Sequence, residues 1–243
     1  MRAEVEATAW GSGAPWLIDA LPELLGSADS PEQLDPRGHP LVVEAVRRCP
    51  GLRLGRTGQV WEALAPAVLE QKVTGKQAWL AWSSLLRRFG EVPPGPAPKG
   101  MRVPPAPSTW SRIPSWDWHR AGVDGARSRT LVGAAKVADR LERLESAVAD
   151  KRLRSLPGIG IWTSAEVRQR AHGDPDAISV GDYHLAAFVG WALTGQPVDD
   201  DAMLELLEPW VGQRQRVVRL LASVVEPPPR RGPRATITDH RAR

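Results

Sequence analysis

The sequence predicts an all-α fold built from two blocks of helices. Apolar residues recur at intervals of three and four along most of the chain, which is typical of amphipathic helices. Residues 92–109 hold seven prolines and two glycines, and this composition predicts an extended surface connection between the two blocks. A chain of 243 residues with 42% apolar content is long enough to bury a substantial core in one or two domains.

The first block is expected to begin with one strand and to continue as helices. Residues 4–11 alternate between apolar and polar side chains, which is typical of a strand. Helices are expected over residues 14–26 and 39–51, each ended by glycine. Residues 57–90 form a longer helical region, which we expect to divide near residues 73–75.

The second block shows strong helical periodicity in all but its first segment, residues 110–122. The periodic segments are residues 125–156, 162–173, 182–195 and 199–225. The tail, residues 226–243, contains five arginines and three consecutive prolines, so we expect it to be irregular and to contact phosphate.

The charge is distributed unevenly along the chain. Residues 1–50 carry eight acidic and four basic side chains, whereas the remainder carries 28 basic and 20 acidic ones. A basic body of this kind favours a polyanionic partner, because Lys and Arg that neutralise phosphates release condensed counterions. The single cysteine, Cys49, excludes an intramolecular disulfide and any cage of several cysteines around zinc or iron–sulfur.

No segment of the sequence suggests a membrane. No apolar run approaches the roughly 18 residues of a membrane-spanning helix, and the first residues lack the apolar core of a signal peptide. We therefore expect a cytoplasmic protein with no membrane partner.

A tight glycine turn lies between two amphipathic segments in "LRSLPGIGIWTSAEV", residues 153–167. Glycines allow the backbone to approach a ligand closely, and the helix that follows directs unpaired N–H groups outward. A DNA phosphate is expected at the amides of Gly158 and Gly160, with the hydroxyl of Thr163 as a further donor. The alternative is a helix corner in which glycine serves packing alone.

An aspartate, Asp182, begins an apolar helix 22 residues beyond Gly160. With this pairing the sequence resembles the helix-hairpin-helix DNA glycosylase superfamily, in which a hairpin of the "LPGIG" type is followed at this distance by an essential aspartate. "PGIGIWTSAEV", "GDY" and "LEQKVTGKQA" are similar to its 3-methyladenine glycosylase branch, over residues 36–225. The resemblance implies a monomer with a cleft between two helical lobes, and duplex DNA with a damaged base as its partner.

The resemblance also implies roles for individual residues. Asp182 is the expected catalytic group, with a helix N-cap as the alternative. Trp162, Tyr183 and Glu166 are expected to line the base pocket, although Trp162 is alternatively a core residue. Expected DNA contacts are Gly158, Ile159, Gly160, Thr163, Ser164, Gln71, Lys72, Val123, Gly125 and Arg127. No cofactor is expected to be required; Na⁺ or K⁺ is expected on the carbonyl oxygens of Arg154, Leu156 and Ile159.

The sequence departs from the branch at positions that bear on substrate choice. Glu166 stands where the branch carries a further aromatic residue, and "EQKVT" matches the usual Gly-Gln-Gln-Val-Ser pattern only in part. Gly125 stands where a leucine would fill the vacated base stack, so Val123, Trp116 and Trp118 are the substitutes to consider.

Two absences narrow the implied chemistry. Relatives that also cut the DNA strand place a lysine two residues after the hairpin, where this sequence has Trp162, so no Schiff-base nucleophile is expected there. The iron–sulfur branch needs four cysteines, so no such cluster is expected either.

The resulting hypothesis is a monofunctional glycosylase that hydrolyses the bond between an alkylated purine and its sugar. The alternatives are a non-catalytic protein that binds damaged or abasic DNA, and a glycosylase for a bulkier adduct. The expected organisation is residues 1–35 as a remnant strand and first helix, 36–225 as the glycosylase domain, and 226–243 as the tail. The lone strand is expected to have lost the partners that the branch carries in an N-terminal antiparallel domain.

Overall fold

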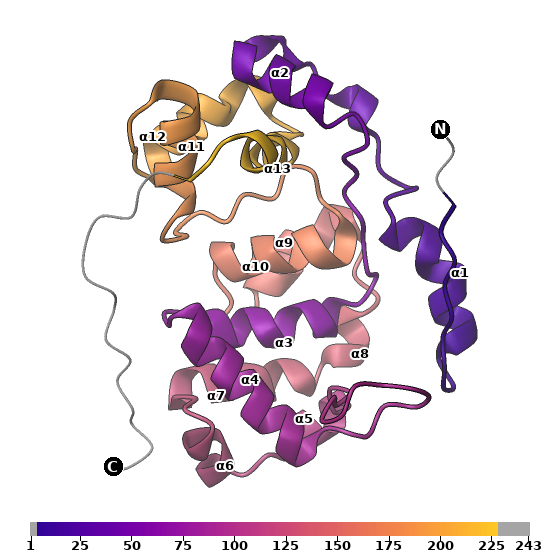
Figure 1. Cartoon of the computed structure of the whole chain (residues 1–243). Helices are drawn as coiled ribbons and strands as arrows, with labels where there is room; N and C mark the ends of the chain where they lie inside the picture. Colours follow the sequence, from indigo (N-terminus) through magenta and orange to yellow (C-terminus); the bar gives the residue numbers. More distant parts are fainter. Residues whose placement is uncertain (1–3, 228–243) are drawn as a thin grey trace.

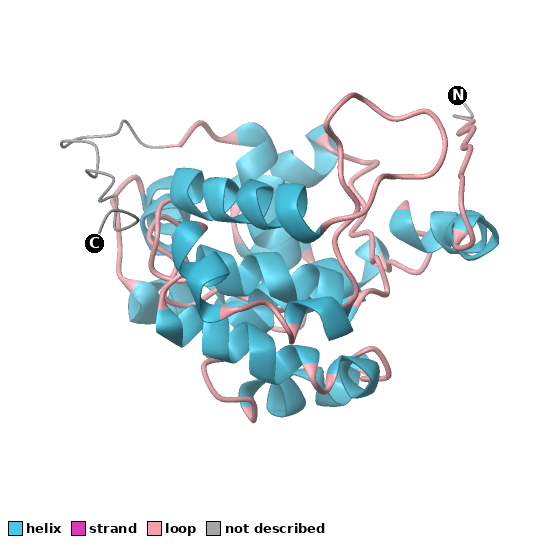
Figure 2. Ribbon diagram, turned by 90° about the horizontal axis from the view of Figure 1, so that it is seen from below, coloured by secondary structure: helices cyan, strands magenta, loops and turns pink. Residues whose placement is uncertain are grey.

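The computed structural model describes residues 4–227, and the regular secondary structure in this range consists of helices joined by loops. Residues 4–227 form thirteen α-helices and four shorter helical turns, and no strand is assigned among them. Figure 2 shows these helices joined by loops. The predicted all-α class is therefore confirmed. None of the helices between residues 4 and 227 combines the length and apolar character needed to cross a bilayer. Most of the predicted tail, from residue 228 onward, lies outside the described range.

The element bounds follow the chain in three groups. The first comprises α1 (Ala14–Leu24), η1 (Pro31–Gln33), η2 (Pro36–Gly38), α2 (Pro40–Arg48), α3 (Val60–Glu70) and α4 (Gly75–Phe89). The second comprises α5 (Pro107–Trp110), α6 (Ser115–Arg120), α7 (Gly125–Ala135), α8 (Ala138–Leu141), α9 (Ser146–Arg154) and α10 (Ile161–Val167). The third comprises η3 (Arg168–His172, a π-helical turn), α11 (Leu185–Thr194), α12 (Asp200–Leu207), η4 (Glu208–Trp210) and α13 (Arg214–Val224).

The division of the long region 57–90 has a clear local cause. Thr74 Oγ1 accepts a hydrogen bond from the amide of Gln77 at 3.3 Å, and Gln77 Oε1 accepts one from the amide of Thr74 at 3.0 Å. This reciprocal capping box satisfies two amides at the start of α4. The split predicted near residues 73–75 is confirmed.

The strand predicted over residues 4–11 is wrong. No β-bridge or strand includes these residues, and they lie instead beside the proline-rich loop, where a Cβ on Gly95 would stand 2.3 Å from Trp10 Cγ. Alternation of side chains does not suffice for a strand, because backbone N–H and C=O groups need a neighbouring strand to pair with.

The proline-rich segment is also more ordered than the sequence suggested. Glu91 and Val103 exchange backbone hydrogen bonds of 3.1 and 3.0 Å as an isolated antiparallel bridge. Pro107 opens the short helix α5, a position where the missing amide costs nothing. The extended connection predicted over residues 92–109 is therefore wrong at its end, where residues 107–109 belong to α5. A second short helix, α6, forms in residues 110–122, where the helical pattern is weak.

Two separate hydrophobic cores divide the molecule into two lobes. The middle lobe has a core that runs from Val60 to Ala171, and the end lobe combines core residues 34–45 with residues 178–221. Figure 1 shows α2, α11, α12 and α13 together on one side, and α3 to α8 on the other. The two-lobed prediction agrees with these cores.

The proline-rich segment does not join the two lobes, contrary to the expectation. Leu85 of α4 precedes it and Trp110 of α5 follows it, yet both belong to the core of the middle lobe. Within this core Trp110 stacks on Trp82 at 5.8 Å between ring centroids and meets the edge of Trp61 at 6.2 Å. Such aromatic pairs bury large apolar areas, so the segment is a loop within one lobe.

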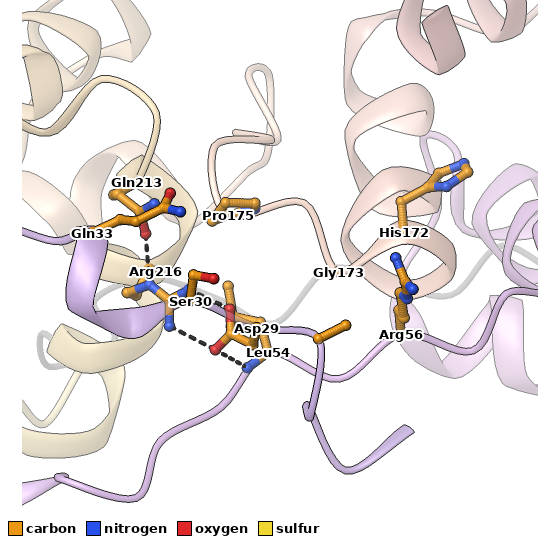
Figure 3. A pocket seen from close by; sticks show the side chains of 11 residues that line it. Asp29, Ser30, Gln33, Leu54, Arg56, His172, Gly173, Pro175, Gln213 and Arg216 are labelled. Carbon is orange, nitrogen blue, oxygen red and sulfur yellow. Dashed lines mark hydrogen bonds and ion pairs between the residues drawn. The ribbon is translucent and has the colours of Figure 1, made fainter. Parts of the chain in front are cut away.

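The true connections between the lobes pass through residues 49–59 and 172–178. A polar pocket of about 230 Å³ lies there, with His172 and Arg56 on one side and Asp29 and Arg216 on the other (Figure 3). Asp29 and Arg216 form an ion pair whose side chains are 3% and 2% exposed. Burial acts to raise the pKa of Asp29, but hydrogen bonds from Arg216 and the Leu54 amide outweigh it and hold the pKa below 3.8.

Candidate active site

The hairpin of residues 156–160 is a tight turn with two glycines, Gly158 and Gly160. The backbone requires glycine only at residue 158. Gly158 has φ of +83°, and a Cβ there would stand 1.9 Å from Thr130 Oγ1 on α7. The amide of Ile159 donates to the carbonyl of Leu156 at 3.1 Å, and the Ile159 side chain is buried in the middle-lobe core. Gly160, with φ of −94°, has open space around it and precedes α10.

A side chain from α3's end ties the hairpin to the rest of the lobe. Gln71 Nε2 donates to the carbonyl of Gly158 at 3.0 Å and to Thr163 Oγ1 at 2.8 Å. In Figure 1, α9 and α10 lie between α3 and the helices of the end lobe. Gln71, at the end of α3, therefore fixes the hairpin to the middle lobe. The helices α9 and α10 lie on the side of this lobe that is next to the end lobe.

The two expected DNA contacts on α10, Thr163 and Ser164, lie inside the protein. Thr163 is 2% exposed, and its hydroxyl is bound by Gln71. Ser164 is fully buried, and its hydroxyl donates to Asp150 Oδ1 at 2.8 Å. Both side chains therefore fix α10 in place, which corrects the expectation that they meet a phosphate.

The hairpin and Asp182 are brought together by one hydrogen bond. Trp162, in the first turn of α10, donates from Nε1 to Asp182 Oδ2 at 3.2 Å. The other oxygen of Asp182 accepts from the amides of His184 at 2.9 Å and Leu185 at 3.0 Å, at the start of α11. Asp182 thus caps a helix with one oxygen and presents the other beside the indole of Trp162. Capping and a catalytic position are compatible in the same side chain.

The other two expected pocket residues are placed differently from each other. Tyr183 is 91% exposed, and its ring packs edge-on against His184 at 4.8 Å rather than against Trp162. Glu166 lies one turn after Trp162, with a side chain that is 13% exposed. Its Oε1 accepts a short hydrogen bond from Ser179 Oγ, and its Oε2 pairs with Arg170 Nη1 at 2.5 Å. Both Glu166 oxygens are therefore occupied by protein groups.

Of the three side chains suggested for the base stack, the structure buries Val123 and Trp118 and leaves Trp116 exposed. Val123 is 4% exposed and belongs to the core, and Trp118 is buried, with its indole N–H donating to Ile113. Gly125 begins α7 at the surface, and Trp116 is 64% exposed. Val123 and Trp118 face inward because they complete the middle-lobe core, so a role in the base stack stays a prediction for Trp116 alone.

Arg127 is a structural residue rather than an exposed phosphate contact. Its guanidinium donates to Asp124 Oδ2 at 2.6 Å, to the Leu69 carbonyl at 2.8 Å and to the Gly122 carbonyl at 3.1 Å. The residue is 6% exposed, so it links the start of α7 to the end of α3.

Lys72 is exposed and has an unusual backbone conformation. Its φ of +54° is the one positive value among the non-glycine residues that the structure describes. A non-glycine residue in the left-handed region carries strain, and such strain concentrates at functional sites. Lys72 follows Gln71 directly, so this exposed, positively charged residue is next in the chain to the side chain that binds the hairpin.

The expected monovalent cation stays a prediction. Of its three expected carbonyl ligands, that of Leu156 already accepts the Ile159 amide, which leaves one lone pair for an ion. Across residues 4–227, no group of three or more His, Cys, Asp or Glu side chains is arranged to hold a metal.

Local sequence patterns do not mark the residues that support this site. Ser179, Arg170 and Asp150 bind Glu166 or α10, and nothing in their local pattern marks them. Neither the pocket between the lobes nor the one beside Trp61 and Trp82 is lined by Trp162 or Asp182.

Comparison with known structures assigns the fold. The chain has the fold of the helix-hairpin-helix DNA glycosylases. It superposes on a 3-methyladenine DNA glycosylase from Archaeoglobus fulgidus with a TM-score of 0.66 and 21% identity, covering 85% of this chain and 73% of that one. A Clostridium acetobutylicum 8-oxoguanine glycosylase/lyase, solved with double-stranded DNA, gives a TM-score of 0.66 at 13% identity over 85% and 73% of the two chains.

One curated sequence relative points to the same class. The probable bifunctional transcriptional activator/DNA repair enzyme AlkA of Mycobacterium tuberculosis is 32% identical over 145 residues, which make up 58% of this chain. The matched region spans only 29% of that longer protein. No family model matches the chain.

Proposed function

We propose that this protein is a monofunctional DNA glycosylase that excises alkylated purines, of the 3-methyladenine or 7-methylguanine type, from duplex DNA in base excision repair. The observation that supports this most directly is the contact between Trp162 and Asp182 beside the hairpin. It places an aromatic face, a carboxylate and a glycine turn at one junction between the lobes. The proposal is also supported by the fold, which this chain shares with a known 3-methyladenine DNA glycosylase.

DNA would be held at the hairpin in this proposal. The amides at Gly158 and Gly160 are the phosphate donors, and Lys72 adds a positive charge from the neighbouring loop. The basic excess beyond residue 50 supports association with the duplex through counterion release. The proposed partner is double-stranded DNA, bound by one copy of the chain.

The site must supply free energy that offsets the cost of flipping the base out of the duplex. Flipping a nucleotide costs a few kcal/mol, and stacking on an aromatic side chain returns about 1–3 kcal/mol per base. Trp162 is the aromatic residue next to Asp182, so the everted base is proposed to stack on its ring. A positively charged alkylpurine adds roughly 0.5–2 kcal/mol through cation–π attraction.

The proposed chemistry needs one carboxylate. The bond between the sugar C1′ and the purine nitrogen breaks, and its electron pair neutralises the cationic base, so the leaving group needs no general acid. Asp182 stabilises the positive charge that develops on the sugar. A water molecule then attacks C1′, and its proton passes to the Asp182 carboxylate and on to solvent.

The absence of lyase activity is part of the proposal. A lyase step requires an amine that forms a Schiff base with the sugar, and Trp162 occupies the position where related lyases carry lysine. Borohydride reduction during the reaction is therefore expected to trap no protein–DNA adduct.

A non-catalytic protein that binds damaged or abasic DNA is the second candidate. It is favoured by Gly125 and the buried Val123, neither of which can fill the base stack, and by the three N–H donors that already engage Asp182. A third candidate is a glycosylase for bulkier adducts. It is favoured by Glu166, which stands where an aromatic residue was expected and whose carboxylate is bound to Ser179 and Arg170.

One experiment distinguishes these functions. The protein is incubated with duplexes that each carry one modified base, including methylated purines and a bulky adduct. Freed base is then identified by mass spectrometry, and the abasic product is cleaved with alkali. Release of a methylated purine supports the proposal, and release of the bulky adduct alone supports the third candidate. Tight binding of an abasic-analogue duplex with no base released from any substrate supports the second candidate.

A further inference from the structure

Residues 179–182, which end at Asp182, form one closed backbone turn. The amide of Asp182 donates to the carbonyl of Ser179 at 3.1 Å. Gly181 stands at the third position of the turn with φ of +86°, the conformation that this position of a type II turn requires. Because the two ends of the turn are bonded to each other, the position of Ser179 determines the position of Asp182.

The side chain of Ser179 is buried, and its hydroxyl is both a donor and an acceptor. It donates to Glu166 Oε1 and accepts from Gln169 Nε2 at 2.9 Å. Gln169 Nε2 also donates to the carbonyl of Ala177 at 2.9 Å, and Gln169 Oε1 accepts from Gln215 Nε2 at 3.0 Å. A buried polar network whose members are all bonded holds its side chains in one arrangement.

These bonds cross from one lobe to the other. Glu166 precedes Val167, which belongs to the core of the middle lobe. Ser179 follows Ile178, which belongs to the core of the end lobe. The bond between Glu166 and Ser179 therefore connects α10 of the middle lobe to the segment of the end lobe that leads to Asp182.

The helix α10 contacts both ends of the turn 179–182. Trp162 and Glu166 lie one helical turn apart on α10, and so they face the same side of it. Trp162 donates to Asp182 Oδ2 at 3.2 Å, and Glu166 accepts from Ser179. Hydrogen bonds weaken steeply as their distance and angle depart from the optimum. The carboxylate of Asp182 therefore cannot move away from α10 without breaking one of these contacts.

The carboxylate of Glu166 is engaged entirely within the protein. Its Oε1 binds Ser179, its Oε2 pairs with Arg170 at 2.5 Å, and its side chain is 13% exposed. Hydrogen bonds to an ionised carboxylate are roughly twice as strong as those between neutral groups. Loss of Glu166 would also leave the buried Ser179 hydroxyl without its acceptor. The interactions of Glu166 therefore act on the turn 179–182.

We propose that Glu166 and Ser179 are positioning residues for Asp182, acting across the lobe junction to set where its carboxylate stands relative to the sugar of the everted nucleotide. The inference rests on the proposed glycosylase function. It assigns Glu166 to the turn that carries Asp182, whereas the sequence predicted it in the base pocket. A misplacement of reacting groups by about 1 Å is enough to slow a reaction by about 10².

The test compares variants of this contact with a matched control. Single-turnover release of a methylated purine and affinity for an abasic-analogue duplex are measured for the wild type, Ser179→Ala, Glu166→Ala and Glu166→Gln. The control is Glu142→Ala, because the carboxylate of Glu142 also joins two segments by accepting two hydrogen bonds, from the amides of Val60 and Trp61 at 2.8 Å each. Both of those bonds lie within the middle lobe, so thermal unfolding of all the variants shows how much lost stability alone affects release.

Ser179→Ala and Glu166→Ala are expected to slow base release by about tenfold or more and to leave abasic-duplex affinity unchanged. Glu166→Gln keeps an acceptor for Ser179, so it is expected to recover most of the rate. Glu142→Ala is expected to unfold at a lower temperature and to release base at the wild-type rate.

A double variant shows whether Ser179 acts through Asp182. Residues that act as one unit have strongly non-additive effects on rate. Ser179→Ala is therefore expected to cause no further slowing when it is added to Asp182→Asn. An equal slowing in both backgrounds would show that Ser179 does not act through the carboxylate, and would overturn the inference.

The remaining outcomes separate this inference from the proposed function. A wild type that releases base while Ser179→Ala and Glu166→Ala release it equally fast would overturn the inference alone. Slowing in Glu142→Ala to the same extent would also overturn it, since lost stability would then explain the effect. A wild type that releases no base from any methylated duplex would overturn the proposed function, and the inference with it.

Discussion

The indole of Trp162 donates a hydrogen bond of 3.2 Å to Oδ2 of Asp182, and this bond joins the helix after the hairpin to the turn before α11. The two residues belong to different lobes by their surroundings: α10 packs on α3 in the middle lobe, whereas α11 packs on α12 in the end lobe. The candidate site is therefore made by the way the lobes meet. Any change that shifts one lobe against the other is expected to separate the carboxylate from the aromatic face.

The first prediction concerns the carboxylate of Asp182. Asp182→Asn keeps an oxygen that can cap α11 but removes the negative charge, so base release is expected to fall by about 10² or more while the fold persists. Single-turnover release from methylated duplex and affinity for an abasic-analogue duplex are the two measurements. Asp199→Asn is the matched control, since Asp199 Oδ1 caps α12 at the Ala202 amide. Loss of abasic binding together with activity would point to a folding defect instead.

The second prediction concerns the buried ion pair of Asp29 and Arg216 at the lobe junction. Asp29→Asn leaves the Arg216 charge buried without its counterion, so the free energy of unfolding at pH 7 is expected to fall by about 3–5 kcal/mol. The effect depends on pH with a definite sign. Because the pKa of Asp29 is held below 3.8, its stabilising contribution is present above pH 3.8 and is lost as the pH falls through the folded-state value.

Denaturant unfolding of both proteins between pH 3 and pH 7 measures this difference. The gap between wild type and Asp29→Asn is expected to narrow toward the acidic end. Asp35→Asn is the control, since Asp35 and Arg37 form a pair that is exposed to solvent and is expected to contribute little. A gap that stays constant over the whole range would contradict the assignment of the effect to ionised Asp29.

The third prediction concerns the backbone of Lys72. Lys72→Gly relieves the strain of a positive φ and is expected to raise the free energy of unfolding by about 1 kcal/mol. It also removes a charge beside the hairpin, so DNA affinity is expected to fall and the slope of log K against log salt to flatten by about 0.9. Lys99→Gly, in the proline-rich loop, is the control and should change neither the slope nor the affinity. A stability gain without any change in the salt slope would remove Lys72 from the DNA-binding surface.

The class and the helices of this protein follow from local patterns in the sequence. Thr74 and Gln77 form a capping box within four residues, and this explains why the split of the region 57–90 was predictable. The strand over residues 4–11 was not, because a strand depends on a partner that local alternation does not reveal. The lobe boundary was missed for a similar reason. Side chains from before and after the proline-rich loop pack together around Trp110, and such long-range contacts are not visible in a local sequence pattern.

The candidate site was likewise predictable in part. The spacing of the hairpin and Asp182 identified two groups that the structure brings together, and the Trp162 bond was not needed to propose them. Which side chains are free to act depends on packing. Arg127 and Thr163 have the polar chemistry of DNA contacts, but both are bonded inside the middle lobe. Arg127 donates to the carbonyl of Leu69, and Thr163 accepts from Gln71.

The last prediction separates the two glycines of the hairpin. Gly158→Ala forces a side chain into the left-handed region and against Thr130 Oγ1, which is backed by α7, so a large loss of stability, about 2 kcal/mol or more, is expected. Gly160→Ala meets open space at a φ that any residue adopts, so its thermal unfolding should stay close to that of the wild type. Because the same open space is where a phosphate would approach, Gly160→Ala is expected to weaken binding to an abasic-analogue duplex. If Gly160→Ala binds that duplex as well as the wild type does, the amide of residue 160 does not contact the backbone, and the glycine pair serves only to close the turn.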